Sequence, residues 1–302
     1  MSYKLHSVSV FLCFSMLSLS FFPLAAQDSL SHPTHILVIS LDGTRPDAIL
    51  QADTPNIQAL AAHGAVDWEA LTVLPSVTLP AHTSMLTGLN VDQHGVGYNG
   101  TQPGCPVLEF PTFLTLAEEA RYKTAIVAGK EKFCMYKQTE TVDYTFAREG
   151  DRSVVDRVLE LLDNDFTVIF AHFPNPDYFG HITAWMSDTY ISELHSTDFQ
   201  VGRILKKLDE LDLTDETLII LTADHGGHDF EHGSDRPEDQ HIPWIIAGAG
   251  VIPGTTLENV SVMDTAPTVL WSLGLPLPEN LSGVPVYAAF DVPTPESTNE
   301  AT

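Results

Sequence analysis

Three aspartates and three histidines are spaced along this 302-residue chain in a pattern that suits metal binding. They are Asp42, Asp177, His181, Asp224, His225 and His232. A mixed set of carboxylates and imidazoles suits zinc or manganese better than magnesium or calcium, which prefer oxygen ligands. Six side chains exceed what one catalytic ion with an open position requires. We therefore expect two divalent ions about 4 Å apart, Zn²⁺ or Mn²⁺, each held by three of these residues.

Thr78 offers a second kind of chemistry, nucleophilic attack, within residues 75–85, which read Pro-Ser-Val-Thr-Leu-Pro-Ala-His-Thr-Ser-Met. A hydroxyl at the start of a helix most often serves as an N-cap, and this segment alone favours capping. The same position would let a metal ion lower the pKa of the hydroxyl. It would also present the N–H groups of a helix N-terminus to a phosphate.

Short apolar segments that alternate with helical patterns must position these residues. Strands are predicted at residues 35–41, 124–128, 166–170, 217–222 and 242–247, and helices around residues 57–61, 113–117, 154–162, 188–211 and 264–273. This alternation predicts an α/β fold, a mostly parallel central sheet with helices on both faces. Ligands bind beyond the carboxyl ends of the strands in such sheets. The six candidate ligands follow three of these ends, so we expect them to converge.

Composition excludes some classes of partner. The chain has 40 acidic and 14 basic residues, a formal net charge of −26, which repels a nucleic-acid duplex and anionic lipid. Hydrophobic residues make up 44% and charged residues 18%, an ordinary balance for a folded protein. We find no repeat and no long linker, and predict one catalytic domain over residues 27–290. Residues 291–302 are rich in Pro, Ser, Thr and Glu and are predicted to be disordered.

The first 26 residues resemble a signal peptide. Lys4 and His6 precede an apolar run over residues 8–22, and residues 23–26 offer small side chains for cleavage. An uncleaved anchor is the alternative, but the run is Ser-rich and short for a membrane span. We expect a secreted or periplasmic protein with no stable membrane insertion after cleavage. Cys105 and Cys134 remain, and the sequence leaves open whether they form a disulfide or stay separate buried thiols.

Taken in order, the motifs resemble the alkaline phosphatase superfamily and, within it, the type I phosphodiesterase/nucleotide pyrophosphatase family, over about residues 36–286. They are Asp42-Gly43, Pro75-x-x-Thr78-x-Pro80-x-His82, His94-Gly95 with Asn99, Asp177-x-x-Gly180-His181, Asp224-His225-Gly226, His232-Gly233-x-Asp235 and Asp264-x-Ala266-Pro267-Thr268. Each motif alone is a weak signal, but their ordered conjunction is specific.

The resemblance implies two zinc ions and a covalent intermediate. Asp177, His181 and His232 would hold one ion, and Asp42, Asp224 and His225, together with Thr78, would hold the other. Thr78 would attack phosphorus to form a phosphothreonine that water hydrolyses. Asn99 and the backbone N–H of Leu79 would bind the non-bridging oxygens, where negative charge develops. Asn99-Gly100-Thr101 also reads as a glycosylation sequon, but a glycan would block the pocket, so the phosphate role is favoured.

Lys130 and Lys132 follow the predicted strand at residues 124–128 and bear on the substrate. They are either solvated surface lysines or a substrate-binding pair that resembles the lysine-containing pairs of superfamily phosphomonoesterases and phosphonoacetate hydrolases. Such cations would bind a monoester dianion or a substrate carboxylate. We expect a phosphodiesterase/nucleotide pyrophosphatase first, and a phosphomonoesterase or phosphonate hydrolase as the alternative. The partner is thus a small-molecule phosphoester, pyrophosphate or phosphonate.

Two other functions fit less well. Sulfatases convert a Cys or Ser of a Cys/Ser-x-Pro-x-Arg motif to formylglycine, and residues 78–82 lack that motif. A non-catalytic metal- or phosphoester-binding protein would keep the ligands and lose Thr78 or Asn99, yet both are present. Turnover of bis-p-nitrophenyl phosphate distinguishes an enzyme from a binding protein.

Overall fold

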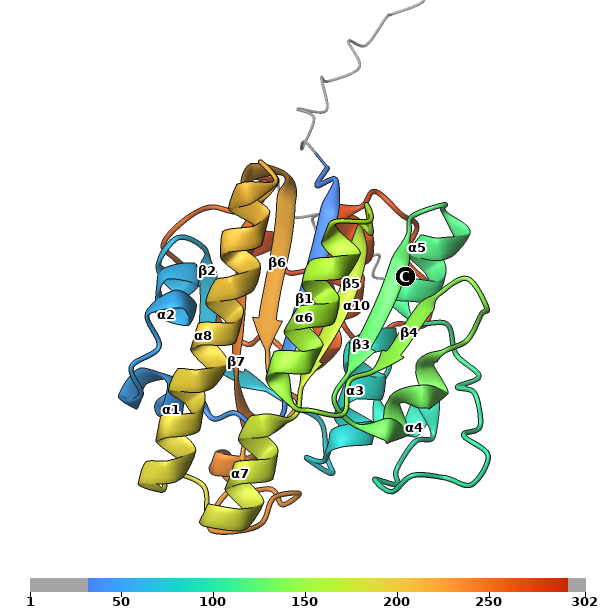
Figure 1. Cartoon of the computed structure of the whole chain (residues 1–302). Helices are drawn as coiled ribbons and strands as arrows, with labels where there is room; N and C mark the ends of the chain where they lie inside the picture. The colour runs from blue at the N-terminus through green and yellow to red at the C-terminus, as the bar shows by residue number, and fades with distance from the viewer. Residues whose placement is uncertain (1–31, 293–302) are drawn as a thin grey trace, which may run out of the picture.

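A computed structural model of the chain describes residues 32–292, which form one eight-stranded sheet in the order β4-β3-β5-β1-β6-β7-β2-β8 (Figure 1). The strands are β1 (His35–Leu41), β2 (Ala65–Leu71), β3 (Thr124–Ala128), β4 (Asp143–Phe146), β5 (Val168–Phe173), β6 (Thr217–Thr222), β7 (His241–Gly248) and β8 (Thr255–Thr256). Strand β7 pairs antiparallel with β6 and β2, and the other pairs are parallel. The predicted α/β fold is confirmed.

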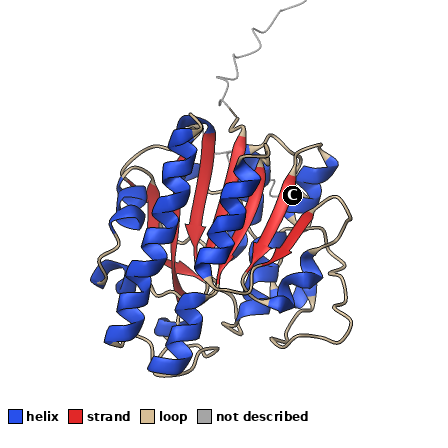
Figure 2. Ribbon diagram, viewed as in Figure 1, coloured by secondary structure: helices blue, strands red, loops and turns tan. Residues whose placement is uncertain are grey.

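Helices cover both faces of the sheet, with α2, α6 and α8 on one face and α3, α5 and α10 on the other (Figures 1 and 2). These are α2 (Pro55–Ala62), α6 (Asp151–Leu162), α8 (Asp188–Glu210), α3 (Thr78–Thr87), α5 (Phe113–Glu119) and α10 (Thr265–Ser272). Shorter helices lie in the connections: α1 (Pro46–Gln51), α4 (Val91–His94), α7 (Asn175–Thr183), α9 (Pro237–Gln240), and the 3₁₀ helices η1 (Glu131–Tyr136), η2 (Thr214–Glu216), η3 (Val262–Asp264) and η4 (Tyr287–Ala289).

The central strand β1 explains why its sequence is continuously apolar. Ile36 and Val38 pack into the core beneath α3, α5 and α10, whereas Leu37, Ile39 and Leu41 pack into the core beneath α2, α6 and α8. A strand buried on both faces needs apolar side chains at every position rather than at alternate ones. Strand β1 and its neighbours are packed on both faces. The residues that follow the carboxyl ends of these strands are therefore held in well-defined positions.

Three strands have the predicted bounds, but the prediction of residues 166–170 was wrong at both ends, since β5 runs to Phe173. Helix α7 then begins at Asn175, which places Asp177 and His181 one helical turn apart. Strand β2 was missed because it includes Asp67 and Glu69, and the buried Asp67 accepts backbone hydrogen bonds from Glu69 and Val260. The predicted signal peptide and most of the predicted tail lie outside the described residues. Within residues 32–292, no helix has the length and apolarity needed to cross a bilayer.

Candidate two-metal active site

The site forms where β5, β1 and β6 end side by side. These strands are neighbours in the sheet, so Asp42 after β1, Asp177 after β5 and Asp224 after β6 meet at one edge. His225 follows Asp224, and its Nε2 lies 3.4 Å from Asp42 Oδ1, 3.3 Å from Asp224 Oδ2 and 4.0 Å from Asp177 Oδ1. The structure thus brings the three carboxylates around one imidazole nitrogen.

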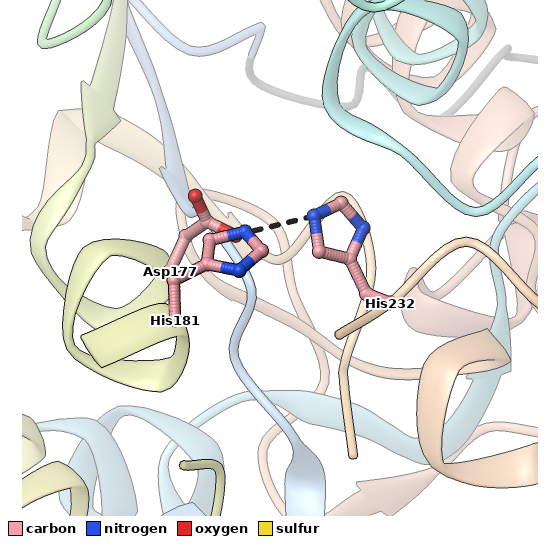
Figure 3. A group of neighbouring side chains, drawn as sticks. All are labelled: Asp177, His181 and His232. Atoms are coloured by element: carbon pink, nitrogen blue, oxygen red, sulfur yellow. Dashed lines mark ion pairs between the residues drawn. The ribbon is translucent and has the colours of Figure 1, made fainter. Parts of the chain in front are cut away.

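His181 and His232 complete the cluster on the α7 side. Asp177 Oδ1 lies 3.4 Å from His181 Nε2 and 3.6 Å from His232 Nε2. Figure 3 shows His232 reaching from its loop towards the Asp177 and His181 side chains of α7. The His225 and His232 rings stack with centroids 3.8 Å apart and so join the two halves of the site. Two sets of potential ligand atoms each lie within 4.8 Å of one another: Asp177, His181 and His232, and Asp42, Asp177 and His225.

Each aspartate uses one carboxylate oxygen for anchoring. Asp42 Oδ2 accepts from His172 Nε2 at 2.7 Å and lies 2.6 Å from Lys130 Nζ. Asp177 Oδ2 lies 2.6 Å from the same ammonium, and Asp224 Oδ1 accepts from the Gly43 N–H at 3.0 Å. These contacts orient the three carboxylates before any ion binds.

The second oxygen of each aspartate is free. Asp42 Oδ1, Asp177 Oδ1, Asp224 Oδ2 and also His225 Nε2 are buried without a hydrogen-bond partner among residues 32–292. An unsatisfied buried polar atom costs about 1–3 kcal/mol, and more when it is charged. Four such atoms that converge are therefore the expected surroundings of a cation, and this donor set fits divalent zinc or manganese.

The three histidines are held in the tautomer that a metal requires. Each Nδ1 faces a backbone carbonyl, which can only accept, so Nδ1 carries the proton and Nε2 presents its lone pair to the site. The pairs are His181 with Phe230 at 2.9 Å, His225 with Gly226 at 2.7 Å and His232 with Ser76 at 3.0 Å. Burial lowers the pKa of His232 to about 4, which keeps it neutral.

His172 supports the site by donating a hydrogen bond to Asp42, although no motif in the sequence includes it. It is fully buried in β5, and the Gly129 N–H donates to its Nδ1 at 3.1 Å, so its Nε2–H donates to Asp42. Burial lowers the pKa of His172 to about 4, so the ring is a neutral donor. The sequence feature that could have indicated this role is a single histidine within an otherwise apolar strand, Val-Ile-Phe-Ala-His-Phe.

Thr78 is the first residue of α3 and does not cap it. The N-cap is Val77, which makes no side-chain capping bond, so the capping alternative is wrong. Thr78 is buried, and its carbonyl accepts from His82 Nδ1 at 2.8 Å. His82 Nε2 in turn lies 2.8 Å from Ser40 Oγ of β1, so this histidine fastens the start of α3 to the sheet.

Lys130 links the Thr78 hydroxyl to both halves of the site. Its ammonium lies 3.4 Å from Thr78 Oγ1, besides its contacts with Asp42 and Asp177. Burial alone would lower the pKa of Lys130, but the two carboxylates raise it, so the side chain stays cationic. The same ammonium and His172 overcome the effect of burial on Asp42 and hold its pKa well below the usual range. Thr78 therefore lies beside carboxylates from both sets.

Asn99 and Lys132 form a separate group at the start of α3. Asn99 Oδ1 accepts from the Leu79 N–H at 3.0 Å and from Lys132 Nζ at 2.8 Å. Both partners are donors, which identifies this atom as the oxygen and leaves Nδ2 without a partner in the described part of the chain. Burial, followed by repulsion from Lys130, lowers the pKa of Lys132 to about 8. A Cys105–Cys134 disulfide joins the loop after Asn99 to η1, which carries Lys132.

Two family models match different parts of the chain. The type I phosphodiesterase / nucleotide pyrophosphatase model matches residues 36–112, and the sulfatase model matches residues 171–275. The first segment contains Asp42, Thr78 and Asn99, and the second contains Asp177, His181, Asp224, His225 and His232.

The similar proteins include both phosphodiesterases and sulfatases. Ectonucleotide pyrophosphatase/phosphodiesterase family member 7 of Mus musculus is 24% identical over 216 residues, 63% of this chain and 49% of that protein. Arylsulfatase K of Homo sapiens is 37% identical over 100 residues, 31% of this chain and 19% of that protein. The chain thus aligns with half or less of each relative. Murine ectonucleotide pyrophosphatase / phosphodiesterase 5, solved as an inactive variant with AMP, superimposes with a TM-score of 0.72 at 16% identity, covering 82% of this chain and 97% of that one.

Proposed function

The chain belongs to the alkaline phosphatase superfamily, as its motifs predicted, and we propose that it is a two-metal phosphoryl-transfer hydrolase with Thr78 as nucleophile. One observation carries this proposal. A single ammonium, that of Lys130, contacts Asp42, Asp177 and the Thr78 hydroxyl, so the hydroxyl lies next to both sets of free ligand atoms. A phosphorus atom attacked there would have its oxygens beside both sets.

The proposed ligand sets are those that the resemblance implies, although the ligand atoms of Asp42 and His225 group within 4.8 Å with Asp177 rather than with Asp224. Asp177, His181 and His232 hold one ion, and Asp42, Asp224 and His225 hold the other with Thr78. When bound, the two ions, zinc or manganese, supply the positive charge that lowers the pKa of the hydroxyl and stabilises developing charge on oxygen. Lys130 adds a fixed cation between the two carboxylates that face it.

The proposed reaction proceeds in two displacements. Thr78 Oγ1 forms a bond to phosphorus, the bond from phosphorus to the leaving-group oxygen breaks, and that oxygen takes up a proton. Water then attacks the phosphothreonine, which releases the phosphoryl product and returns a proton to Thr78. Asn99 Nδ2 holds a non-bridging oxygen. The Leu79 N–H orients Asn99 through its 3.0 Å bond, and a direct bond from it to the substrate would require that contact to open.

We assign the substrate class as a phosphodiester or nucleotide pyrophosphate. The phosphodiesterase match covers the segment with the nucleophile and Asn99, whereas the sulfatase match covers ligands alone. Oxidation of threonine gives a ketone rather than the aldehyde of formylglycine, which disfavours a sulfatase mechanism at Thr78. Lys132 beside Asn99 supports the second candidate, a phosphomonoesterase or phosphonate hydrolase, because it offers a cation to an additional negative charge.

We further propose that residues 27–290 form one catalytic domain that acts outside the cytoplasm, secreted or periplasmic. The Cys105–Cys134 disulfide supports an oxidising compartment, and the first 26 residues have the pattern of a signal peptide.

The deciding experiment compares kcat/KM for bis-p-nitrophenyl phosphate, p-nitrophenyl phosphate, phosphonoacetate and p-nitrophenyl sulfate with zinc-loaded protein. We expect the diester to have the highest value. A highest value for the monoester or phosphonoacetate would favour the second candidate, and one for the sulfate would contradict phosphoryl transfer. Metal-loaded protein that turns over none of them would indicate a binding protein.

A further inference from the structure

A buried carboxylate outside the site holds the helix that carries two of the proposed ligands. Asp151, the first residue of α6, is 2% exposed. Its Oδ1 accepts from the Asn175 N–H at 3.0 Å, and its Oδ2 accepts from Thr197 Oγ1 of α8 at 2.7 Å. Asn175 is the first residue of α7, two positions before Asp177. Asp151 thereby joins the N-terminus of α7 to α6 and α8.

The pairing of Asp151 with Asn175 is reciprocal. Asn175 Oδ1 accepts from the Asp151 N–H at 3.3 Å, while its Nδ2 donates to Glu193 Oε1 at 2.7 Å. The first residue of each helix therefore accepts a hydrogen bond from the first N–H of the other helix. These N–H groups have no partner within their own helices. Gly150 lets the two ends approach, because a Cβ there would clash with Asn175 Oδ1.

This junction bears mainly on one ion. Helix α7 has nine residues and supplies both Asp177 and His181 to the first group of ligand atoms, but only Asp177 to the group with Asp42 and His225. In the assignment proposed above, the second ion is held by Asp42, Asp224 and His225, which follow β1 and β6, two paired strands of the sheet. Metal ligands must be positioned within about 0.5 Å, so a shift at the start of α7 would disturb the first set and, under this assignment, spare the second.

We propose that Asp151 and Asn175 are positioning residues for the ion held by Asp177, His181 and His232. The inference rests on the two-metal function proposed above. It differs from a general stabilising role in predicting a selective effect, the loss of affinity at one of two ion sites.

The chain supplies a matched control in Asp198, the neighbour of Thr197 on α8. Asp198 is 1% exposed and accepts from the Asn56 and Ile57 N–H groups at the start of α2, at 3.3 and 2.8 Å. It is thus another buried carboxylate that caps another helix, but α2 contributes no ligand to the site. Asp198→Ala should destabilise the protein without selectivity between the ions.

The test is a calorimetric titration of the metal-free full chain with Zn²⁺, together with thermal unfolding. We expect wild type to bind two ions and Asp151→Ala to bind one of them about tenfold or more weakly, the scale seen for outer partners of metal ligands. Asp151→Asn should restore the affinity, because its amide can still accept from Asn175 and donate to Thr197. Asp198→Ala should lower Tm with both affinities unchanged. In a His181→Ala background, Asp151→Ala should leave the remaining ion unaffected.

The failures are distinguishable. Wild type that binds fewer than two ions would contradict the two-metal function itself. Two ions in wild type, with equal weakening of both in Asp151→Ala or the same weakening in Asp198→Ala, would overturn the positioning role alone. If Asp151→Ala does not fold, Asn175→Ala is measured instead, since it removes the reciprocal bond and keeps the carboxylate. We expect the same selective loss there, and unchanged affinities would overturn the inference.

Discussion

Lys132 Nζ lies 2.8 Å from Asn99 Oδ1, whereas Lys130 Nζ lies 2.6 Å from Asp42 Oδ2 and 2.6 Å from Asp177 Oδ2. The sequence left open whether the two lysines are solvated surface residues or a substrate-binding pair, and the structure gives them different surroundings. Lys130 faces two aspartates and remains charged, whereas burial brings the pKa of Lys132 to about 8. Among the two, Lys132 has the side chain better placed to meet a charged substrate at Asn99.

Lys132→Ala should lower kcat/KM for p-nitrophenyl phosphate and phosphonoacetate by about 10- to 100-fold, as expected for one charge-assisted hydrogen bond. The diester, which lacks the additional charge, should change little. Because Lys132 is cationic only below its pKa, the preference of wild type for the charged substrates should fall above about pH 8. Steady-state kinetics across pH 6–10 checks both points. Equal losses on all substrates would mean that Lys132 does not discriminate between charged substrates and the diester.

Thr78→Ala should abolish turnover and leave the fold intact, since Thr78 does not cap α3. Thr78→Ser, which keeps the hydroxyl, should retain part of the activity. Acid-quenched wild type should carry one adduct at Thr78 by mass spectrometry, a phosphoryl group that keeps its second ester when the substrate is a diester, and the Ala variant should carry none. Near-normal kcat in Thr78→Ala with full metal content would mean that another group attacks phosphorus.

Metal should stabilise the protein strongly, because binding satisfies four buried atoms that lack partners. At a free concentration of 100 times Kd, each site contributes about 2.7 kcal/mol to the free energy of unfolding. His232→Ala should lose one ion and Asp224→Ala the other, as measured by elemental analysis. A Tm that does not respond to Zn²⁺ or Mn²⁺ would count against the metal centre.

Removing the Cys105–Cys134 disulfide should loosen the contact between Asn99 and Lys132, since the bond joins their two segments. Cys105→Ser/Cys134→Ser should lower the free energy of unfolding by about 2–4 kcal/mol. It should also lower kcat/KM for charged substrates more than for the diester, with metal content unchanged. Wild-type kinetics in this variant would show that the disulfide does not support the positions of Asn99 and Lys132.

Asp151 should make stability depend on pH. Burial, with Glu193 and Asp42 as neighbouring negative charges, raises its pKa to about 7, against about 4 in an unfolded chain. The folded state holds the proton more tightly, so this contribution to stability is fully present below about pH 4 and is lost as pH rises through about 7. The free energy of unfolding of wild type minus that of Asp151→Asn should therefore fall over this window in urea titrations. A constant difference would mean that Asp151 titrates normally.

The fold class and the candidate ligands could be inferred without the structure. Continuous apolar strands alternating with helices imply a parallel sheet, and parallel strands end at one edge. That is why Asp42, Asp177 and Asp224, far apart in the chain, could be expected to meet. The type of each side chain then restricted the metal and the nucleophile, because carboxylates, imidazoles and a hydroxyl have known chemistry.

Which side-chain atoms lack a hydrogen-bond partner depends on contacts between distant segments. The separate surroundings of Lys130 and Lys132, the neutral donor role of His172 and the pairing of Asp151 with Asn175 depend on side-chain directions and distant partners. His172 and Asp42 are 130 residues apart, and no local pattern joins them. The two oxygens of a carboxylate are chemically equivalent until the chain folds. In Asp42, folding gives Oδ2 a hydrogen-bond donor and buries Oδ1 without a donor among the described residues.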